Sequence, residues 1–296
     1  MQTIARFLTR NIGYVALVLG LYGLIPAVIL FFSPEKQITG LWSIFIPIGI
    51  NPQLLTRYTG ISWNFLGVIF YLMMVVGAGR YLQNKFDVSG LLRFCFSAIF
   101  YGSIMRIFWT LLLPVIFMRT TKDSGAPYHW ISLIWVLYPV FLLWVSKIAV
   151  KGMDDELKAT EEKIFSDPVE NILKFETGKN GRFIHLIVDL ILTISLLMPF
   201  LFVFQYFIPG SDMIRTSKFL FITLLFFQRF IYYGVLESVF KATPAKYLTG
   251  SKVVNQHGAT NPGFEKIIMR SLFRFIPFEP FSFLGTTGWH DGLSCT

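Results

Sequence analysis

The stretch IGYVALVLGLYGLIPAVILFF, residues 12–32, contains no charged side chain and decides the class of this protein. A helix needs about 20 mostly apolar residues to cross the hydrocarbon core of a bilayer. Arg6 and Arg10 precede the stretch as in a signal peptide, but it is too long for one and has no small-residue cleavage site before Ser33. We therefore predict a retained transmembrane helix.

The rest of the chain is nearly as apolar. Of its 296 residues, 54% are hydrophobic and only 15% are charged, whereas a soluble domain has about 25% charged residues. We predict an all-α integral membrane protein with six transmembrane helices, for which the lipid bilayer is the main partner. The five further predicted spans are residues 61–79, 94–118, 130–150, 183–208 and 219–240.

A shorter apolar segment occupies residues 38–50. Pro47 breaks it and Asn51-Pro52 follows it, so the segment is too short and too irregular for an ordinary span. We predict an interfacial or re-entrant piece, and a seventh span is the alternative.

The basic residues predict the orientation, because cytoplasmic loops near helix ends are enriched in Lys and Arg. With six spans, 18 of the 26 basic residues fall in the segments on one side of the membrane and 6 fall on the other. Arg106 and Arg229 lie within spans. Both termini are therefore predicted on the cytoplasmic side.

The sequence argues against several other classes of protein. The net charge of +9 does not indicate a nucleic-acid partner, because the basic residues are spread between apolar runs. Cys95 and Cys295 are far apart, and His and Cys do not recur at metal-ligand spacing, so we expect neither a disulfide nor a metal or other cofactor. The sequence also lacks a GxSxG motif and a P-loop, and we do not expect an enzyme.

One long polar connection divides the chain. Its mixed-charge run from Met153 to Lys163 predicts a short exposed helix, followed by a break at Asp167-Pro168. We expect a four-span membrane unit at 1–150, a charged cytoplasmic linker at 151–181, and a two-span unit with a cytoplasmic C-terminal segment at 182–296.

Ionisable residues within a span are expensive to bury, so each is a candidate for function. Arg182, His185 and Asp189 follow one another at spacings that place them along one face of the fifth span. The stripe predicts a polar pathway into the membrane, in which His185 would be a pH-sensitive group. The alternatives are a purely structural lock for the charged pair and an interfacial position for the histidine.

The sixth span has a similar stripe of Arg229, Tyr233 and Glu237. An arginine at this depth requires a carboxylate partner, which Asp189 or Glu237 would supply. Such a pair either serves transport or locks two helices together, since polar contacts between membrane helices contribute only about 1 kcal/mol.

The segment after the sixth span contains two further elements. Val253-Val254 before His257-Gly258 predicts a short strand that enters a turn. In residues 264–276 the apolar side chains recur at helical spacing and the basic side chains lie between them. This pattern predicts an amphipathic helix with a basic face. This helix would lie at the cytoplasmic interface on anionic lipid, or it would pack on the inner mouth of the bundle.

Residues 178–296 resemble the RDD family of bacterial membrane proteins, which is named for one arginine and two aspartates. Arg182 and Asp189 match the arginine that opens the family's first helix and the aspartate within that helix, and Asp291 matches the second aspartate. Ala245 replaces the usual glycine of the connector, which puts in doubt a left-handed turn there. The other matching positions are Thr243, Pro244, Lys246, Leu248, Gly250, Val253, Val254, Gly258, His290 and Thr296.

The resemblance implies a multi-pass protein of the bacterial inner membrane and, for function, transport of an unidentified ligand, with cation/proton exchange proposed for some members. An antiporter needs an intramembrane carboxylate, and Asp189, with Glu237, would take this role while Arg182 and His185 adjust its pKa. We expect a transporter-like protein. Six spans are few for an antiporter that acts alone, and a homo-oligomer would provide more. The alternative is a non-catalytic scaffold or assembly subunit that holds a partner membrane protein. We also expect the His290-Asp291 pair to meet Arg182 at the cytoplasmic face.

Overall fold

The computed structural model describes residues 2–32, 47–48, 64–83, 89–120, 131–164, 178–207, 218–254 and 262–275. These residues are helical almost throughout, and they contain no β-strand. A short helix, α1 (Gln2–Arg10), precedes the main bundle, and α11 (Pro244–Leu248) and α12 (Phe264–Phe273) follow it. The prediction of an all-α membrane protein is confirmed at this level.

Each of the six predicted spans overlaps one long helix. The six helices are α2 (Ile12–Phe32), α5 (Phe65–Gln83), α6 (Ser89–Thr120), α7 (Ile131–Ile164), α8 (Lys179–Phe207) and α10 (Lys218–Phe240). Among the described residues, α2, α5, α6 and α7 contain segments that are long and apolar enough to cross a membrane. The membrane crossings of α8 and α10 remain predictions from the sequence.

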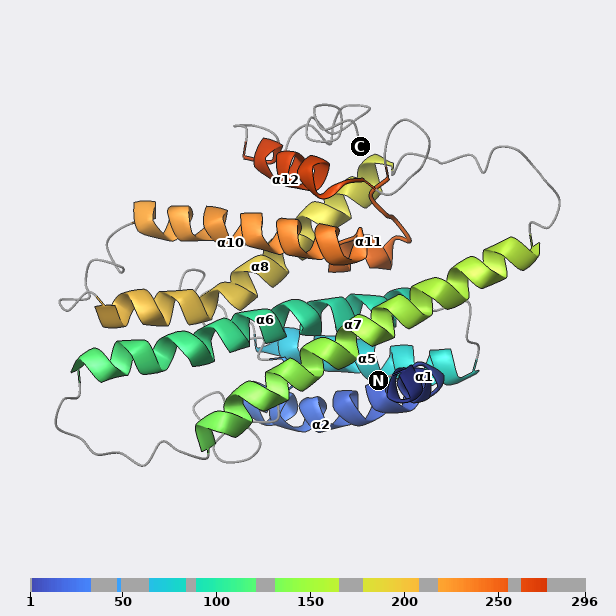
Figure 1. The fold of residues 1–296 in the computed structure, drawn as a ribbon, viewed down its shortest axis with the longest axis horizontal. Helices are drawn as coiled ribbons and strands as arrows, with labels where there is room; N and C mark the ends of the chain where they lie inside the picture. Colours follow the sequence, from blue (N-terminus) through green and yellow to red (C-terminus); the bar gives the residue numbers. More distant parts are fainter. Residues whose placement is uncertain are drawn as a thin grey trace.

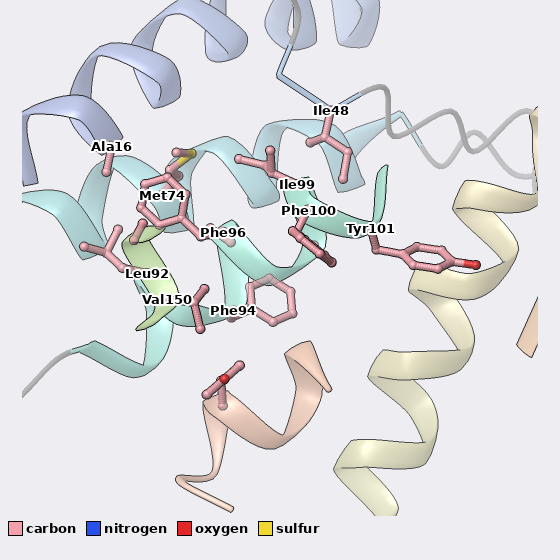
Figure 2. Packing of buried hydrophobic residues seen from close by; sticks show 14 of the residues in the cluster. Ala16, Ile48, Met74, Leu92, Phe94, Phe96, Ile99, Phe100, Tyr101 and Val150 are labelled. Atoms are coloured by element: carbon pink, nitrogen blue, oxygen red, sulfur yellow. The ribbon is translucent and has the colours of Figure 1, made fainter. Parts of the chain in front are cut away.

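Helix α6 is the centre of the bundle. It contacts α5 and α7 on one side and α8, α10 and α11 on the other, so it lies between the α2–α5 pair and the C-terminal helices (Figure 1). Every described side chain from Leu92 to Tyr101 is buried. Figure 2 shows Phe96, Ile99 and Tyr101 of α6 within this core. The C-terminal helices therefore rest on α6.

Small residues allow the helices to approach closely, as is common in membrane bundles. A Cβ atom added at Gly23 of α2 would collide with the ring of Tyr71 in α5. A Cβ atom added at Gly90 of α6 would lie 2.8 Å from the carbonyl oxygen of Tyr247 in α11. The second contact fixes how closely the connector after α10 packs on the N-terminal unit.

Two predictions about local structure are wrong. The charged run from Met153 to Lys163 is not a separate short helix, because α7 continues without a break to Ile164. A helix that leaves the membrane can continue when its next residues are good helix formers, and Glu, Lys, Leu, Ala and Met make up most of this run. Val253-Val254 is not a strand; instead, the backbone N–H of Val253 donates to the carbonyl oxygen of Lys241.

Most of the predicted re-entrant segment 38–50 lies outside the described residues, and so does the break at Asp167-Pro168. Pro47 and Ile48 are described and buried. The hydroxyl of Tyr71 donates to the carbonyl oxygen of Ile48 over 2.6 Å and accepts from its N–H over 3.2 Å. A single side chain of α5 thus satisfies both backbone groups of Ile48.

Candidate functional site

Asp189, near the cytoplasmic end predicted for α8, is one of two buried carboxylates among the described residues of the C-terminal unit. Only 1% of its surface is exposed. The hydroxyl of Tyr232 in α10 donates to its Oδ1 atom over 2.7 Å, and the N–H of Ala245 in α11 donates to the same atom over 3.4 Å. The Thr243 hydroxyl lies beside the carboxylate without meeting hydrogen-bond geometry. The hydrogen-bond donors to Asp189 within the described structure are therefore neutral.

Tyr232 connects this carboxylate to the N-terminal unit. Its ring packs edge-on against that of Tyr101 in α6, with 5.0 Å between the ring centroids. Tyr101 extends from α6 toward α8 in Figure 2, and its hydroxyl donates to the backbone carbonyl of Gln228 over 3.4 Å. The side-chain amide of Gln228 is itself buried, and it has no hydrogen-bond partner among the described residues. Uncharged polar groups thus line the junction of α6, α8 and α10.

Glu237, one turn before the end of α10, has the opposite surroundings. It is completely buried, and its Oε1 atom accepts from Lys246 Nζ and from Arg274 Nη2, each over 2.8 Å. Arg270 Nε lies 3.7 Å from Oε2. Three cations from α11 and the α12 region therefore surround one carboxylate, and this pairing compensates the cost of burying its charge.

The connector after α10 positions Lys246. Thr243 is the N-cap of α11 and Pro244 occupies the first turn, where a missing N–H does no harm. The helix ends at Leu248, and after its C-cap, Thr249, comes a left-handed residue, Gly250, with a φ of 68°. Ala245 is helical and buried, so the left-handed turn of this motif falls at Gly250 and not at Ala245.

The remaining predicted site residues are placed as follows. His185 Nε2 lies 2.5 Å from the hydroxyl of Thr249, so it faces the connector, and Arg182 is half-buried near the start of α8. Arg229 lies over the ring of Tyr233, 5.7 Å from its centroid. The prediction that Asp189 or Glu237 pairs with Arg229 is wrong for the part of the chain that the structure describes. Glu237 instead pairs with Lys246, Arg270 and Arg274, which lie outside the predicted spans. The predicted contact of Arg182 with His290-Asp291 lies outside the described residues.

A second charged cluster joins the two units. Asp154, in the extension of α7, pairs with Arg93 of α6 over 3.0 Å and with Lys252 of the connector over 3.2 Å. The guanidinium of Arg93 also lies 5.1 Å from the centroid of the Tyr247 ring. Burial raises the pKa of Tyr247, and the charge of Asp154 raises it further. This cluster was not predicted, because Asp154 lies in a linker that has the composition of a solvated segment, and Arg93 and Lys252 come from distant parts of the sequence.

The chemistry available to the site is that of a buried carboxylate with hydroxyl and amide neighbours. Within the described residues, no group of three or more His, Cys, Asp or Glu side chains is arranged to hold a metal ion. A small pocket lies between α1, α2, α6 and α7, and it includes neither Asp189 nor Glu237. The two carboxylates thus differ in their partners: Asp189 accepts from a hydroxyl and a backbone amide, whereas Glu237 faces three cations.

Comparisons with known proteins agree with the resemblance seen in the sequence. The searches of curated proteins and of solved structures found no match. The sequence model of the RDD family matches residues 180–289, which include both carboxylates, the connector and α12. The match confirms the resemblance, and the C-terminal part of this membrane protein is therefore similar to the RDD family.

Proposed function

We propose that this protein is an ion-coupled membrane transporter in which Asp189 binds and releases the coupling proton or cation. The observation that carries the proposal is the contrast between the two buried carboxylates. Asp189 is held by a hydroxyl and a backbone amide, whereas Glu237 is held by Lys246 and two arginines.

This contrast matters because a coupling site must change its charge during every cycle. A carboxylate held by neutral donors can take up a proton without breaking an ion pair. Glu237 cannot do so as readily, since protonation would leave three buried cations facing a neutral acid. We therefore assign the exchange of the ion to Asp189 and a structural role to Glu237.

The position of Asp189 also suits coupling to a conformational change. Its two hydrogen-bond donors lie in different elements, Tyr232 in α10 and Ala245 in α11. Protonation of the carboxylate would weaken its hold on both donors, because a neutral acid is a poorer acceptor than a carboxylate. Loading the ion would thereby loosen α8 from α10 and α11.

The test is cation-dependent proton flux in proteoliposomes, with the wild type compared with Asp189→Asn. The matched control is Asp155→Asn, the same chemical change at an exposed position in the α7 extension. We expect Asp189→Asn to abolish flux and Asp155→Asn to retain it. Wild-type flux that persists in a folded Asp189→Asn protein would contradict the assignment of the site.

The second candidate is a scaffold or assembly subunit. It is favoured by the ion pairs that join the two units, Arg93 and Lys252 with Asp154, which suit a rigid framework. Absence of flux from the folded wild type across all tested cations and pH values would favour this candidate. Native mass spectrometry from the membrane would then test for a homo-oligomer or a stoichiometric partner.

A further inference from the structure

Helix α12 runs alongside α10 (Figure 1). Ile268, near the middle of α12, lies next to Gly234 of α10. Phe275, just past the end of α12, packs against Phe230 and Phe226, with ring centroids 6.1 and 5.3 Å apart. From Ile268 to Phe275 the apolar contacts move backward along α10, so the two helices are antiparallel.

The contacts also give the depth that this segment reaches. Phe226 precedes Glu237 by 11 residues, which corresponds to about 16 Å along the axis of α10. Since α10 is a predicted span that ends at Phe240, 14 residues or about 21 Å from Phe226, a partner of Phe226 lies at or beyond the middle of the ~30 Å hydrocarbon core. A helix lying flat on the membrane surface would not reach this level.

The polarity of α12 is the reverse of that expected for a helix in water. Arg270 and Arg274 are buried against Glu237, and Arg274 also stacks 3.7 Å from the centroid of the Tyr233 ring. Ile267 is buried as well, but three other large apolar side chains point outward: Phe264 is 68% exposed, Leu272 47% and Met269 43%. An outward apolar face with inward charges suits a lipid environment.

The apolar face of α12 continues that of α10. Phe226 and Phe227 of α10 are 45% and 56% exposed, and Phe226 is in ring contact with Phe275. The charged residue on the outer face of α12 is Glu265, which lies in the first turn, where the headgroups would be. The outer surfaces of α10 and α12 thus form one apolar surface with its charge at one end.

We propose that α12 is inserted into the leaflet at the C-terminal end of α10, and that Met269 and Leu272 contact lipid acyl chains while Phe264 lies near the headgroups. By the predicted topology, this is the cytoplasmic leaflet. Its two arginines are tolerated at this depth because they pair with Glu237, and their long side chains reach back toward the end of α10. The assignment goes beyond the proposed transport function and is independent of the role of Asp189.

Site-directed spin labelling of the full chain in proteoliposomes tests this placement. Single cysteines at Phe264, Met269 and Leu272 would be introduced into a protein that carries Cys95→Ala and Cys295→Ser. Labels at Phe227 and Lys179, both at exposed positions, serve as the lipid-facing and the aqueous control. Accessibility to oxygen, which partitions into lipid, is compared with accessibility to a water-soluble nickel chelate.

We expect oxygen accessibility to exceed chelate accessibility at Met269 and Leu272, with immersion depth increasing from Phe264 to Leu272. The two end positions are separated by eight residues, about 12 Å along a helix. Equal depth at the headgroup level for all three labels would mean a flat interfacial helix and would overturn the proposal. Accessibility to the chelate at Leu272 would also overturn the proposal. Protection of the labels from both reagents would overturn it as well, because it would indicate that a second copy of the chain covers this face.

Discussion

At the scale of single residues, the Tyr232 hydroxyl makes the shorter of the two hydrogen bonds to the Asp189 carboxylate. Tyr232→Phe removes this donor and leaves Asp189 with the longer bond from Ala245. Because a buried acceptor that loses its donor costs about 1–3 kcal/mol, we expect the free energy of unfolding to fall by that amount. Reversible unfolding in mixed micelles would measure the change.

The neighbouring ring provides the control for this prediction. Tyr101→Phe removes a hydroxyl whose bond to the Gln228 carbonyl is 3.4 Å long, while the aromatic contact with Tyr232 is kept. We expect a smaller loss of stability than for Tyr232→Phe. An equal or larger loss for Tyr101→Phe would show that the hydrogen bond to Asp189 is not the stronger of the two.

The sequence predicted which polar residues lie along one face of α8 and of α10, but it did not predict their partners. Helical spacing placed Asp189 and Glu237 on the faces that the structure buries. The partners of Glu237 lie on α11 and next to or within α12, which return to α10 only in the folded chain. Sequence spacing within one helix carries no information about such contacts.

At the scale of elements, Glu237 is the attachment point of α12 and α11 to α10. Glu237→Gln removes the charge that faces Lys246, Arg270 and Arg274, and the loss of one partner from a buried ion pair costs about 3–5 kcal/mol. We expect a loss of stability of this size and faster hydrogen exchange in α11 and α12. Glu265→Gln, an exposed carboxylate in the first turn of α12, is the control and should change neither.

The elements themselves show what hydropathy can and cannot predict. All six long helices follow from apolar runs, because the length needed to cross a bilayer is fixed by its thickness. The orientation of α12 did not follow, since an amphipathic pattern has two faces and does not say which solvent each one meets. Its two arginines face the protein, as in the alternative of a helix packed on the bundle.

At the scale of the whole molecule, the N-terminal unit and the RDD-like unit are joined where α11 packs on α6. Gly90 permits this packing, since a Cβ atom there would lie 2.8 Å from the carbonyl oxygen of Tyr247. The ion pairs of Asp154 with Arg93 and Lys252 fasten the same junction. Nothing in the sequence pattern of the linker indicated this contact, because exposed charged helices and docked ones have the same composition.

This junction yields a prediction with a closely matched control. Gly90→Ala should push α11 away from α6, because a backbone oxygen cannot move aside as a flexible side chain does. Gly79→Ala in α5 has nothing within 4 Å of the new Cβ atom, and an alanine in a helix is favoured over glycine by up to about 1 kcal/mol. We expect Gly90→Ala to lower the unfolding temperature and to speed hydrogen exchange in α11. Gly79→Ala should leave hydrogen exchange in α11 unchanged and should leave the unfolding temperature equal or raise it. If both variants behaved alike, the close contact between α6 and α11 would not be what holds the two units together.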